Sequence, residues 1–179
     1  PRDGVGSLEF LGRTMEYYTE SFLDFLDADA IRRLAPRLVI DYAFGPLCLV
    51  MPLVLGRLGC EATALNAFID PTRSYEAWLG REDRVAELAQ VVRALRADLG
   101  VLVGGHGDRF AVVDEQGEKV FGDDLLLSFL VLVLESDGPG TRVAVPFGAT
   151  SGVEEVCQRY GASVVRCKAD PGALMETAG

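Results

Sequence analysis

The sequence predicts an α/β fold of three layers, in which helices cover both faces of a mixed, mostly parallel, four-stranded sheet, followed by a partial second α/β unit. Short runs of branched residues alternate with amphipathic helical patterns along the chain. Hydrophobic residues make up 49% of the 179 residues, which is enough for a real core. One connection between strand-like runs, residues 104–109, is too short for a parallel crossover and predicts an antiparallel return.

The N-terminal region precedes the predicted sheet. Residues 1–14 read as a tail or linker, because they contain glycines and little periodicity. Residues 15–35 read as a helical lead-in, with one helix from Met15 and a second short helix after Asp29, a good N-cap residue. Since the sequence lacks an initiator Met, we expect it to be a piece of a longer chain.

A strand–helix–strand unit is predicted next. Residues 37–42 and 61–65 have strand composition, and a helical pattern runs between them. Pro52 lies inside that pattern, so the helix is either kinked there or begins later. Two strands around one helix imply parallel pairing with a right-handed crossover. The loop that follows, residues 66–80, is long enough to be functional, although a packed aromatic loop is the alternative.

The centre of the chain combines a helix with the antiparallel return. Residues 82–96 form a clean amphipathic helix, and residues 99–103 form the third strand. Residues 110–113 are expected to return antiparallel. Between them, the 104–109 loop reads Gly-Gly-His-Gly-Asp-Arg, which is either a tight connector or a site for an ion or phosphate. The loop matches neither the dinucleotide-binding fingerprint nor the P-loop.

The C-terminal third begins with an apolar helix at residues 123–135, for which Asp123 is a candidate cap. Its predicted buried face consists of Leu126, Phe129, Leu130 and Val133. Residues 136–140, rich in glycine and proline, are the predicted linker. Two further strands, 142–146 and 163–167, flank a helix. The segment before that helix, Gly148-Ala149-Thr150-Ser151-Gly152, either holds a phosphate or simply provides an N-cap.

Composition narrows the classes of partner. Acidic residues outnumber basic ones 27 to 17, the net charge is −10, and no basic cluster occurs, which argues against nucleic acids and anionic membranes. The longest apolar run, residues 125–134, is too short to span a bilayer. The four cysteines form no C-x-x-C pair, which predicts buried free thiols in a cytoplasmic protein rather than a zinc or redox site.

Several strings occur in an order that matches one enzyme family. They are V-I-D-Y-A-F-G at 39–45, A-D-L-G-V at 97–101, G-H-G-D-R at 105–109, V-V-D-E-Q-G at 112–117, G-D-D-L-L at 122–126 and V-V-R-C-K at 164–168. From about residue 37 to 176 the chain therefore resembles the α-D-phosphohexomutases, the phosphoglucomutases and phosphomannomutases. The resemblance assigns residues 36–137 to the metal-loop domain II and residues 141–179 to part of domain III.

The resemblance also implies a set of site residues. In this family three aspartates of a D-G-D-G-D-R loop hold Mg²⁺, which offsets the charge on the phosphoryl group. Here the three positions are Gly104, His106 and Asp108, so we expect Mg²⁺ binding to be lost or weak, with Asp108 and then His106 as the candidate ligands. Arg109 and Lys168 match family positions and are candidate contacts to phosphate or sugar phosphate. A salt bridge with a nearby acid is the alternative role of Arg109.

Two hypotheses for function follow from the resemblance. The chain is either a fragment of a mutase that moves phosphate between the 1- and 6-positions of a hexose, inactive alone, or a non-catalytic mutase-like module fused to a sugar-1-phosphate nucleotidyltransferase such as a mannose-1-phosphate guanylyltransferase. No catalytic serine loop, sugar-recognition loop or further cofactor site can be assigned in the sequence. Open strand edges of a partial domain predict pairing with a second copy.

Overall fold

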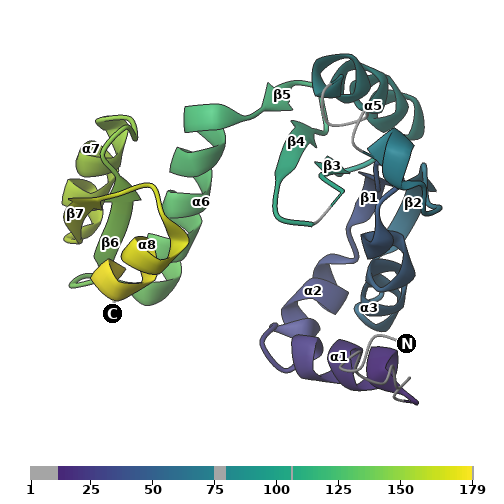
Figure 1. The fold of residues 1–179 in the computed structure, drawn as a ribbon, viewed down its shortest axis with the longest axis horizontal. Coiled ribbons are helices and arrows are strands. Elements are labelled where there is room, and N and C mark those ends of the chain that lie inside the picture. Colours follow the sequence, from purple (N-terminus) through teal and green to yellow (C-terminus); the bar gives the residue numbers. More distant parts are fainter. Residues whose placement is uncertain (1–11, 75–79, 106, 179) are drawn as a thin grey trace, which may run out of the picture. The chain divides into compact units, whose positions relative to one another are not determined.

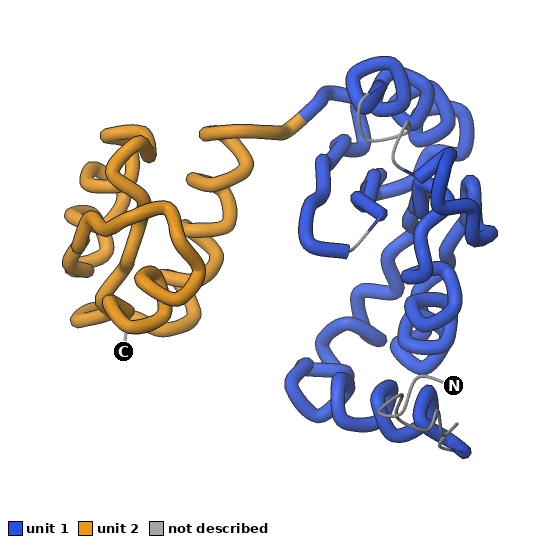
Figure 2. Tube along the Cα trace, viewed as in Figure 1, with its two compact units in different colours: residues 1–119 blue, residues 120–179 orange. Residues whose placement is uncertain are grey.

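The computed structural model describes residues 12–74, 80–105 and 107–178. The chain divides into two compact units, residues 1–119 and residues 120–179 (Figure 2). Most of the predicted N-terminal tail lies outside the described residues, as do Trp78 and the candidate ligand His106. Over the described ranges, no helix combines the length and the apolar character needed to cross a membrane.

Unit 1 is an α/β sheet domain preceded by two helices (Figure 1). Its elements are α1 (Thr14–Leu23), α2 (Ala28–Leu34), β1 (Arg37–Asp41), η1 (Pro46–Leu49), α3 (Met51–Arg57), β2 (Glu61–Leu65), α5 (Arg81–Leu95), β3 (Leu99–Val103), β4 (Phe110–Asp114) and, at the junction with unit 2, β5 (Lys119–Val120). The strand order is β2-β1-β3-β4-β5. β1 is parallel to β2 and β3, and β4 is antiparallel to β3. The predicted α/β fold with a mixed sheet is confirmed.

The sheet has five strands rather than the predicted four. The additional strand, β5, is a two-residue strand at the edge beside β4. A strand of this length shows no alternation of apolar and polar residues, so sequence periodicity does not reveal it.

Alternating side chains of β1 build a core on each face of the sheet. Val39 is buried on one face with Leu88 and Val92 of α5. Ile40 is buried on the other face with Leu55 of α3. Because successive strand residues point to opposite faces, the sheet forms the middle of three layers (Figure 1).

The helices of unit 1 differ from their predicted starts. α2 is capped by Asp27, whose carboxylate accepts the Ala30 N–H at 2.9 Å, and not by Asp29. Asp29 lies in the first turn and pairs with Arg32 instead. Pro52 lies in the first turn of α3, which settles the choice between a kinked helix and a later start in favour of the later start. A proline is tolerated there because a first-turn N–H has no partner within the helix.

Unit 2 is a small α/β unit with a two-stranded parallel sheet. Its elements are α6 (Gly122–Asp137), β6 (Arg142–Pro146), α7 (Gly152–Tyr160), β7 (Ser163–Cys167) and α8 (Pro171–Ala178). No helix was predicted for the α8 segment. α6 packs on α7, so the structural division lies before α6, whereas the glycine-rich residues 136–140 indicated a division after it.

The predicted buried face of α6 is confirmed at Leu130 and wrong at its three other residues. Leu130 and Leu134 are buried against β6 and α7, while Leu126, Phe129 and Val133 are exposed. The N-cap position is Phe121, and Asp123 lies in the first turn without making a cap bond. A helix that is apolar on nearly every side gives no clear periodicity from which to identify its buried face.

The cysteines are free, as predicted, but only one is fully buried. Cys157 is buried in the core of unit 2, while Cys48, Cys60 and Cys167 are half-buried. Burial raises the pKa of the Cys157 and Cys60 thiols, which keeps both in the unreactive protonated form.

Candidate functional site

The 104–109 loop lies at the carboxyl-terminal edge of the parallel strands. It follows β3 directly, next to the end of β1. After β1 the chain passes to β2 on one side, and it then crosses through α5 to β3 on the other side. In open α/β sheets, ligands bind outside the carboxyl ends of strands at the point where the strand order reverses. The fold therefore places the loop where a ligand is expected.

Close contacts fix the position of the loop against the turn that follows β1. The loop is closed by a bond from the Gly104 N–H to the Arg109 carbonyl oxygen, at 2.7 Å. A Cβ on Gly45 would lie 2.8 Å from the carbonyl oxygen of Gly105, so any side chain at Gly45 would force the two backbones apart. A side chain at Gly105 would in turn collide with Ser74. The two glycines are needed for close approach of the turn and the loop.

A buried carboxylate holds the turn in place. Asp41, 3% exposed at the end of β1, accepts the Ala43 N–H at 2.8 Å and both of its oxygens accept the Asn66 side-chain amide, at 3.0 and 2.9 Å. Arg84 of α5 pairs with the same carboxylate at 3.4 Å. Hydrogen bonds and an opposite charge together compensate the burial of this acid. Asp41 was not among the predicted site residues, although an acid at the end of a buried strand was a usable signal.

Asp108 and Arg109 form an exposed ion pair. Arg109 Nε lies 3.4 Å from Asp108 Oδ2, and the two side chains are 64% and 55% exposed. This contact is the alternative role predicted for Arg109, and a contact to phosphate remains a proposal. An exposed pair of this kind contributes about 0–1 kcal/mol, so a phosphate can displace the carboxylate at little cost.

The donor set of the loop does not fit Mg²⁺. This ion requires near-octahedral oxygen coordination, usually from carboxylates, waters and phosphates. Asp108 supplies the only carboxylate of the loop and is already paired with Arg109, while the imidazole of His106 offers nitrogen. Among the residues that the structure describes, no three His, Cys, Asp or Glu side chains are grouped so as to hold a metal ion. The loss or weakening of Mg²⁺ binding stays a prediction, which rests on the chemistry of these donors.

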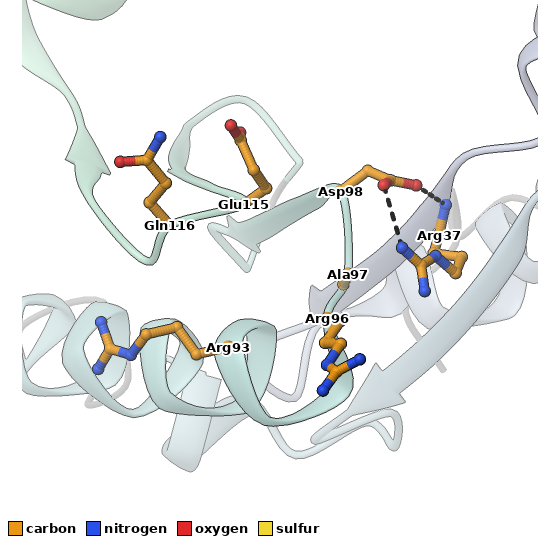
Figure 3. A pocket seen from close by; sticks show the side chains of 7 residues that line it. All are labelled: Arg37, Arg93, Arg96, Ala97, Asp98, Glu115 and Gln116. Carbon is orange, nitrogen blue, oxygen red and sulfur yellow. Dashed lines mark hydrogen bonds and ion pairs between the residues drawn. The ribbon is translucent and has the colours of Figure 1, made fainter.

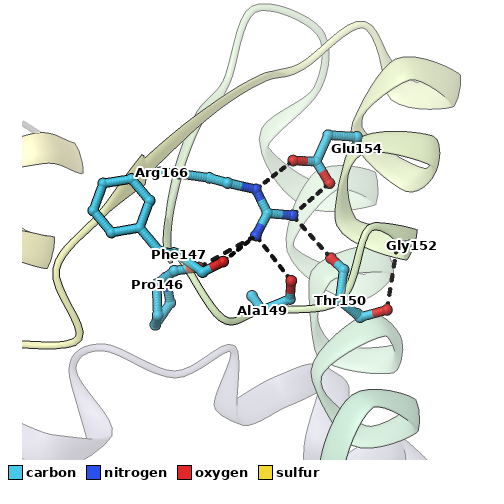
Figure 4. A network of polar contacts seen from close by, with 7 residues as sticks. All are labelled: Pro146, Phe147, Ala149, Thr150, Gly152, Glu154 and Arg166. Carbon is cyan, nitrogen blue, oxygen red and sulfur yellow. Dashed lines mark hydrogen bonds and ion pairs between the residues drawn. The ribbon is translucent and has the colours of Figure 1, made fainter.

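Lys168 belongs to the other unit. It is exposed and follows β7 directly. Two residues earlier, Arg166 donates to the carbonyl oxygens of Phe147 at 3.0 Å and Ala149 at 2.8 Å, and it forms a two-pronged pair with Glu154 at 2.7 and 2.9 Å (Figure 4). The Arg166 bonds lower the pKa of the Glu154 carboxyl. This arginine thereby fixes the turn between β6 and α7.

The N-terminus of α7 follows this turn, with Ser151 at the N-cap position and no side-chain cap bond from it. The Gly152 N–H donates to Thr150 Oγ1 at 3.4 Å, and Glu154 and Glu155 occupy the first turn of α7 (Figure 4). Two carboxylates at this end oppose the approach of an anion. These contacts argue against a phosphate at residues 148–152, while Ser151 occupies the N-cap position without a side-chain cap bond.

A shallow pocket of about 460 Å³ lies at the opposite edge of the sheet, where β1 and β3 begin. Its residues are Arg37, Arg93, Arg96, Ala97, Asp98, Glu115 and Gln116 (Figure 3). The Arg37 N–H donates to Asp98 at 2.7 Å, and this bond lowers the pKa of the Asp98 carboxyl. Glu115 and Gln116 point away from Arg93 and Arg96, so the polar groups do not converge on one point (Figure 3).

Comparison with known proteins identifies the family. The profile described as "Phosphoglucomutase/phosphomannomutase, alpha/beta/alpha domain II" matches residues 16–117, which is more than half of the chain. A probable phosphoglucosamine mutase of Methanopyrus kandleri is 36% identical over 159 residues, 86% of this chain and 33% of the relative. A phosphoglucomutase/phosphomannomutase of Thermococcus kodakarensis is 31% identical over 84% of this chain and 33% of the relative. The chain therefore spans about a third of the length of these relatives.

Solved structures agree on the fold. A phosphoglucomutase/phosphomannomutase family protein from Burkholderia thailandensis superposes with a TM-score of 0.77 at 22% identity, covering 97% of this chain and 38% of that one. A protein from Thermus thermophilus described as a putative phosphomannomutase gives a TM-score of 0.75 at 20% identity, over 92% and 38% of the two chains. Taken with the profile match, these similarities show that the chain belongs to the phosphoglucomutase/phosphomannomutase (α-D-phosphohexomutase) family, with domain II in residues 16–117.

Proposed function

We propose that the chain supplies domain II and the first part of domain III of a protein that binds hexose phosphates, and that the chain alone does not turn them over. The observation that carries this proposal is the position of the 104–109 loop at the carboxyl edge of β1 and β3, packed against Gly45. This is the edge at which α/β sheets bind ligands. The coverage of about a third of each relative supports the second part of the proposal.

The roles we assign to side chains follow from their chemistry. The planar guanidinium of Arg109 can exchange its exposed pair with Asp108 for two parallel hydrogen bonds to a phosphate. Lys168 is exposed at the end of a strand in unit 2 and offers a second cation for the same class of substrate. In a complete enzyme such groups would orient a hexose phosphate during transfer between its 1- and 6-positions. The sequence holds no serine loop to carry the transferred phosphoryl group.

The test is a phosphomutase assay on the 179-residue chain, paired with ligand binding. The substrates are glucose, mannose and glucosamine phosphates, since the relatives carry names that include these sugars. We expect chemical-shift changes at the 104–109 loop with hexose phosphates and no conversion of 1-phosphate to 6-phosphate. Turnover that requires Mg²⁺ and is lost in Asp108→Ala would contradict the proposal.

One observation favours a second candidate, a non-catalytic mutase-like module fused to a sugar-1-phosphate nucleotidyltransferase. The loop has one carboxylate where the three-aspartate motif has three. Such a loop is consistent with a module that does not carry out metal-assisted phosphoryl transfer. This candidate predicts that a longer product of the same gene synthesises a nucleotide sugar at a rate unaffected by Asp108→Ala. The mutase candidate predicts instead that a longer protein containing this chain interconverts hexose phosphates.

A further inference from the structure

A second cationic side chain lies beside the loop in unit 1. Residues 66–74 fold over the turn after β1 through two backbone bonds, Phe44 N–H to the Asn66 oxygen at 3.1 Å and Asp70 N–H to the Phe44 oxygen at 3.0 Å. At the end of this segment, the side chain of Ser74 occupies the space next to Gly105. The residue before Ser74, Arg73, is exposed, and its guanidinium lies over the ring of Phe44, which directly precedes Gly45 in the turn after β1.

Two aromatic rings hold this arginine. The guanidinium of Arg73 lies 4.6 Å from the centre of the Phe44 ring and 5.9 Å from that of Phe68. The two rings pack edge to face with their centres 4.9 Å apart, and Phe44 is buried. A guanidinium carries five N–H donors, so the donors that are not directed at the rings stay available for hydrogen bonds to a ligand.

Among the described residues, three acids near this edge are already bonded to other groups. Asp41 is held by Asn66 and Arg84, and Asp108 is paired with Arg109. Asp70 accepts backbone N–H groups of Thr72 and Arg73, both at 3.1 Å, and caps the helical segment that begins at Pro71. Within the part of the chain that the structure describes, no carboxylate is bonded to the Arg73 side chain.

We propose that Arg73 is an anion-binding residue at this edge, whose guanidinium, held over the Phe44 ring, donates hydrogen bonds to a phosphate group. The ligand class is a phosphate, either free or carried by a sugar. The proposal deepens the proposed function: it rests on the 104–109 edge being the ligand-binding edge, and it adds a contact outside the loop. A guanidinium supplies positive charge there, at an edge where the loop retains one carboxylate of a three-aspartate metal motif.

The test measures binding of inorganic phosphate to the 179-residue chain by nuclear magnetic resonance, at constant ionic strength. Arg73→Gln should weaken phosphate binding by at least about tenfold, as expected for loss of a charge-assisted contact. Arg73→Lys should restore only part of that loss, because an ammonium keeps the charge but lacks the planar fork. Phe68→Leu should weaken binding by about threefold without any change in charge. The matched control is Arg33→Gln, an exposed arginine on α2 that should leave phosphate affinity unchanged.

Equal affinity in the wild-type chain and Arg73→Gln overturns the proposal, as does an equal loss in Arg33→Gln, which would indicate general charge attraction. A second arm repeats the titration with a hexose phosphate. Phosphate that binds through Arg73 while hexose phosphates do not bind would leave the subsite intact and refute the proposed function. Hexose phosphate binding that persists unchanged in Arg73→Gln would refute the subsite and leave the proposed function intact.

Discussion

At the scale of single residues, the structure around the candidate site depends on Asp41. Its carboxylate is buried and is bonded to Ala43, Asn66 and Arg84. Asp41→Ala would therefore leave the buried Ala43 N–H, the half-buried Asn66 side-chain amide and the Arg84 guanidinium without this partner. We expect the free energy of unfolding of unit 1 to fall by about 3 kcal/mol. Urea denaturation followed by circular dichroism measures the change. In the matched control, Asp29→Ala, which breaks an exposed pair with Arg32, the loss should stay below about 1 kcal/mol.

A substitution at Ala35 is expected to raise the stability of the chain. Ala35, the exposed C-cap of α2, has a φ of 44° in the left-handed region, where a Cβ is unfavourable. Ala35→Gly should therefore raise the free energy of unfolding by about 0.5–1 kcal/mol. Ala30→Gly, the same change inside α2, should lower it by a similar amount. Thermal unfolding of both variants tests these two expectations. If the two melting temperatures shift in the same direction, the proposed effect of the left-handed backbone at Ala35 is contradicted.

At the scale of elements, the turn between β6 and α7 should respond to acid. Glu154 has a pKa below its ordinary value of 4.5, chiefly because Arg166 donates hydrogen bonds to its carboxylate. A lowered pKa in the folded state means that the pair stabilises unit 2 above about pH 4.5 and that this stabilisation is lost as the pH falls through the folded pKa.

The corresponding measurement is the urea midpoint of unit 2 between pH 6 and pH 3. We expect Glu154→Gln to lower the midpoint at pH 6 and to flatten its fall with acid. Glu155→Gln, on the same helical turn, should leave both the midpoint at pH 6 and its pH dependence close to those of the unchanged chain. An equal flattening in both variants would show that general repulsion among acids, not the Arg166 pair, causes the acid response.

Most elements of this chain could be predicted from hydrophobic periodicity, because the apolar faces that the periodicity predicts are the faces buried in the core. The β1 alternation of Val39 and Ile40 and the apolar face of α5 are examples. The prediction failed where the sequence shows no clear periodicity. β5 was missed because it is only two residues long, and the buried face of α6 was misassigned because the helix is apolar on nearly every side. The loop could be located from its glycines. The contacts of Arg73 could not be predicted from the sequence. They depend on residues 66–74 folding over Phe44, and no local sequence pattern indicates that packing.

At the scale of the whole molecule, open strand edges predict self-association. β2 lies at the edge of the five-stranded sheet and its residues are largely exposed. We expect a concentration-dependent dimer in analytical ultracentrifugation, weakened by Thr63→Lys, because a charge on an edge strand opposes pairing. A monomer at millimolar concentration would contradict this prediction.

The central claim concerns the whole family site: the frame of the metal loop is present, while its capacity to hold Mg²⁺ is lost or weak. Isothermal titration with Mg²⁺ tests the claim most directly when the chain is compared with the double variant Gly104→Asp plus His106→Asp, which restores three acids. The account predicts binding at least about tenfold tighter in the double variant, since Mg²⁺ affinity depends on carboxylate oxygens. Equal Mg²⁺ affinity in the unchanged chain and the double variant, abolished in both by Asp108→Ala, would contradict it.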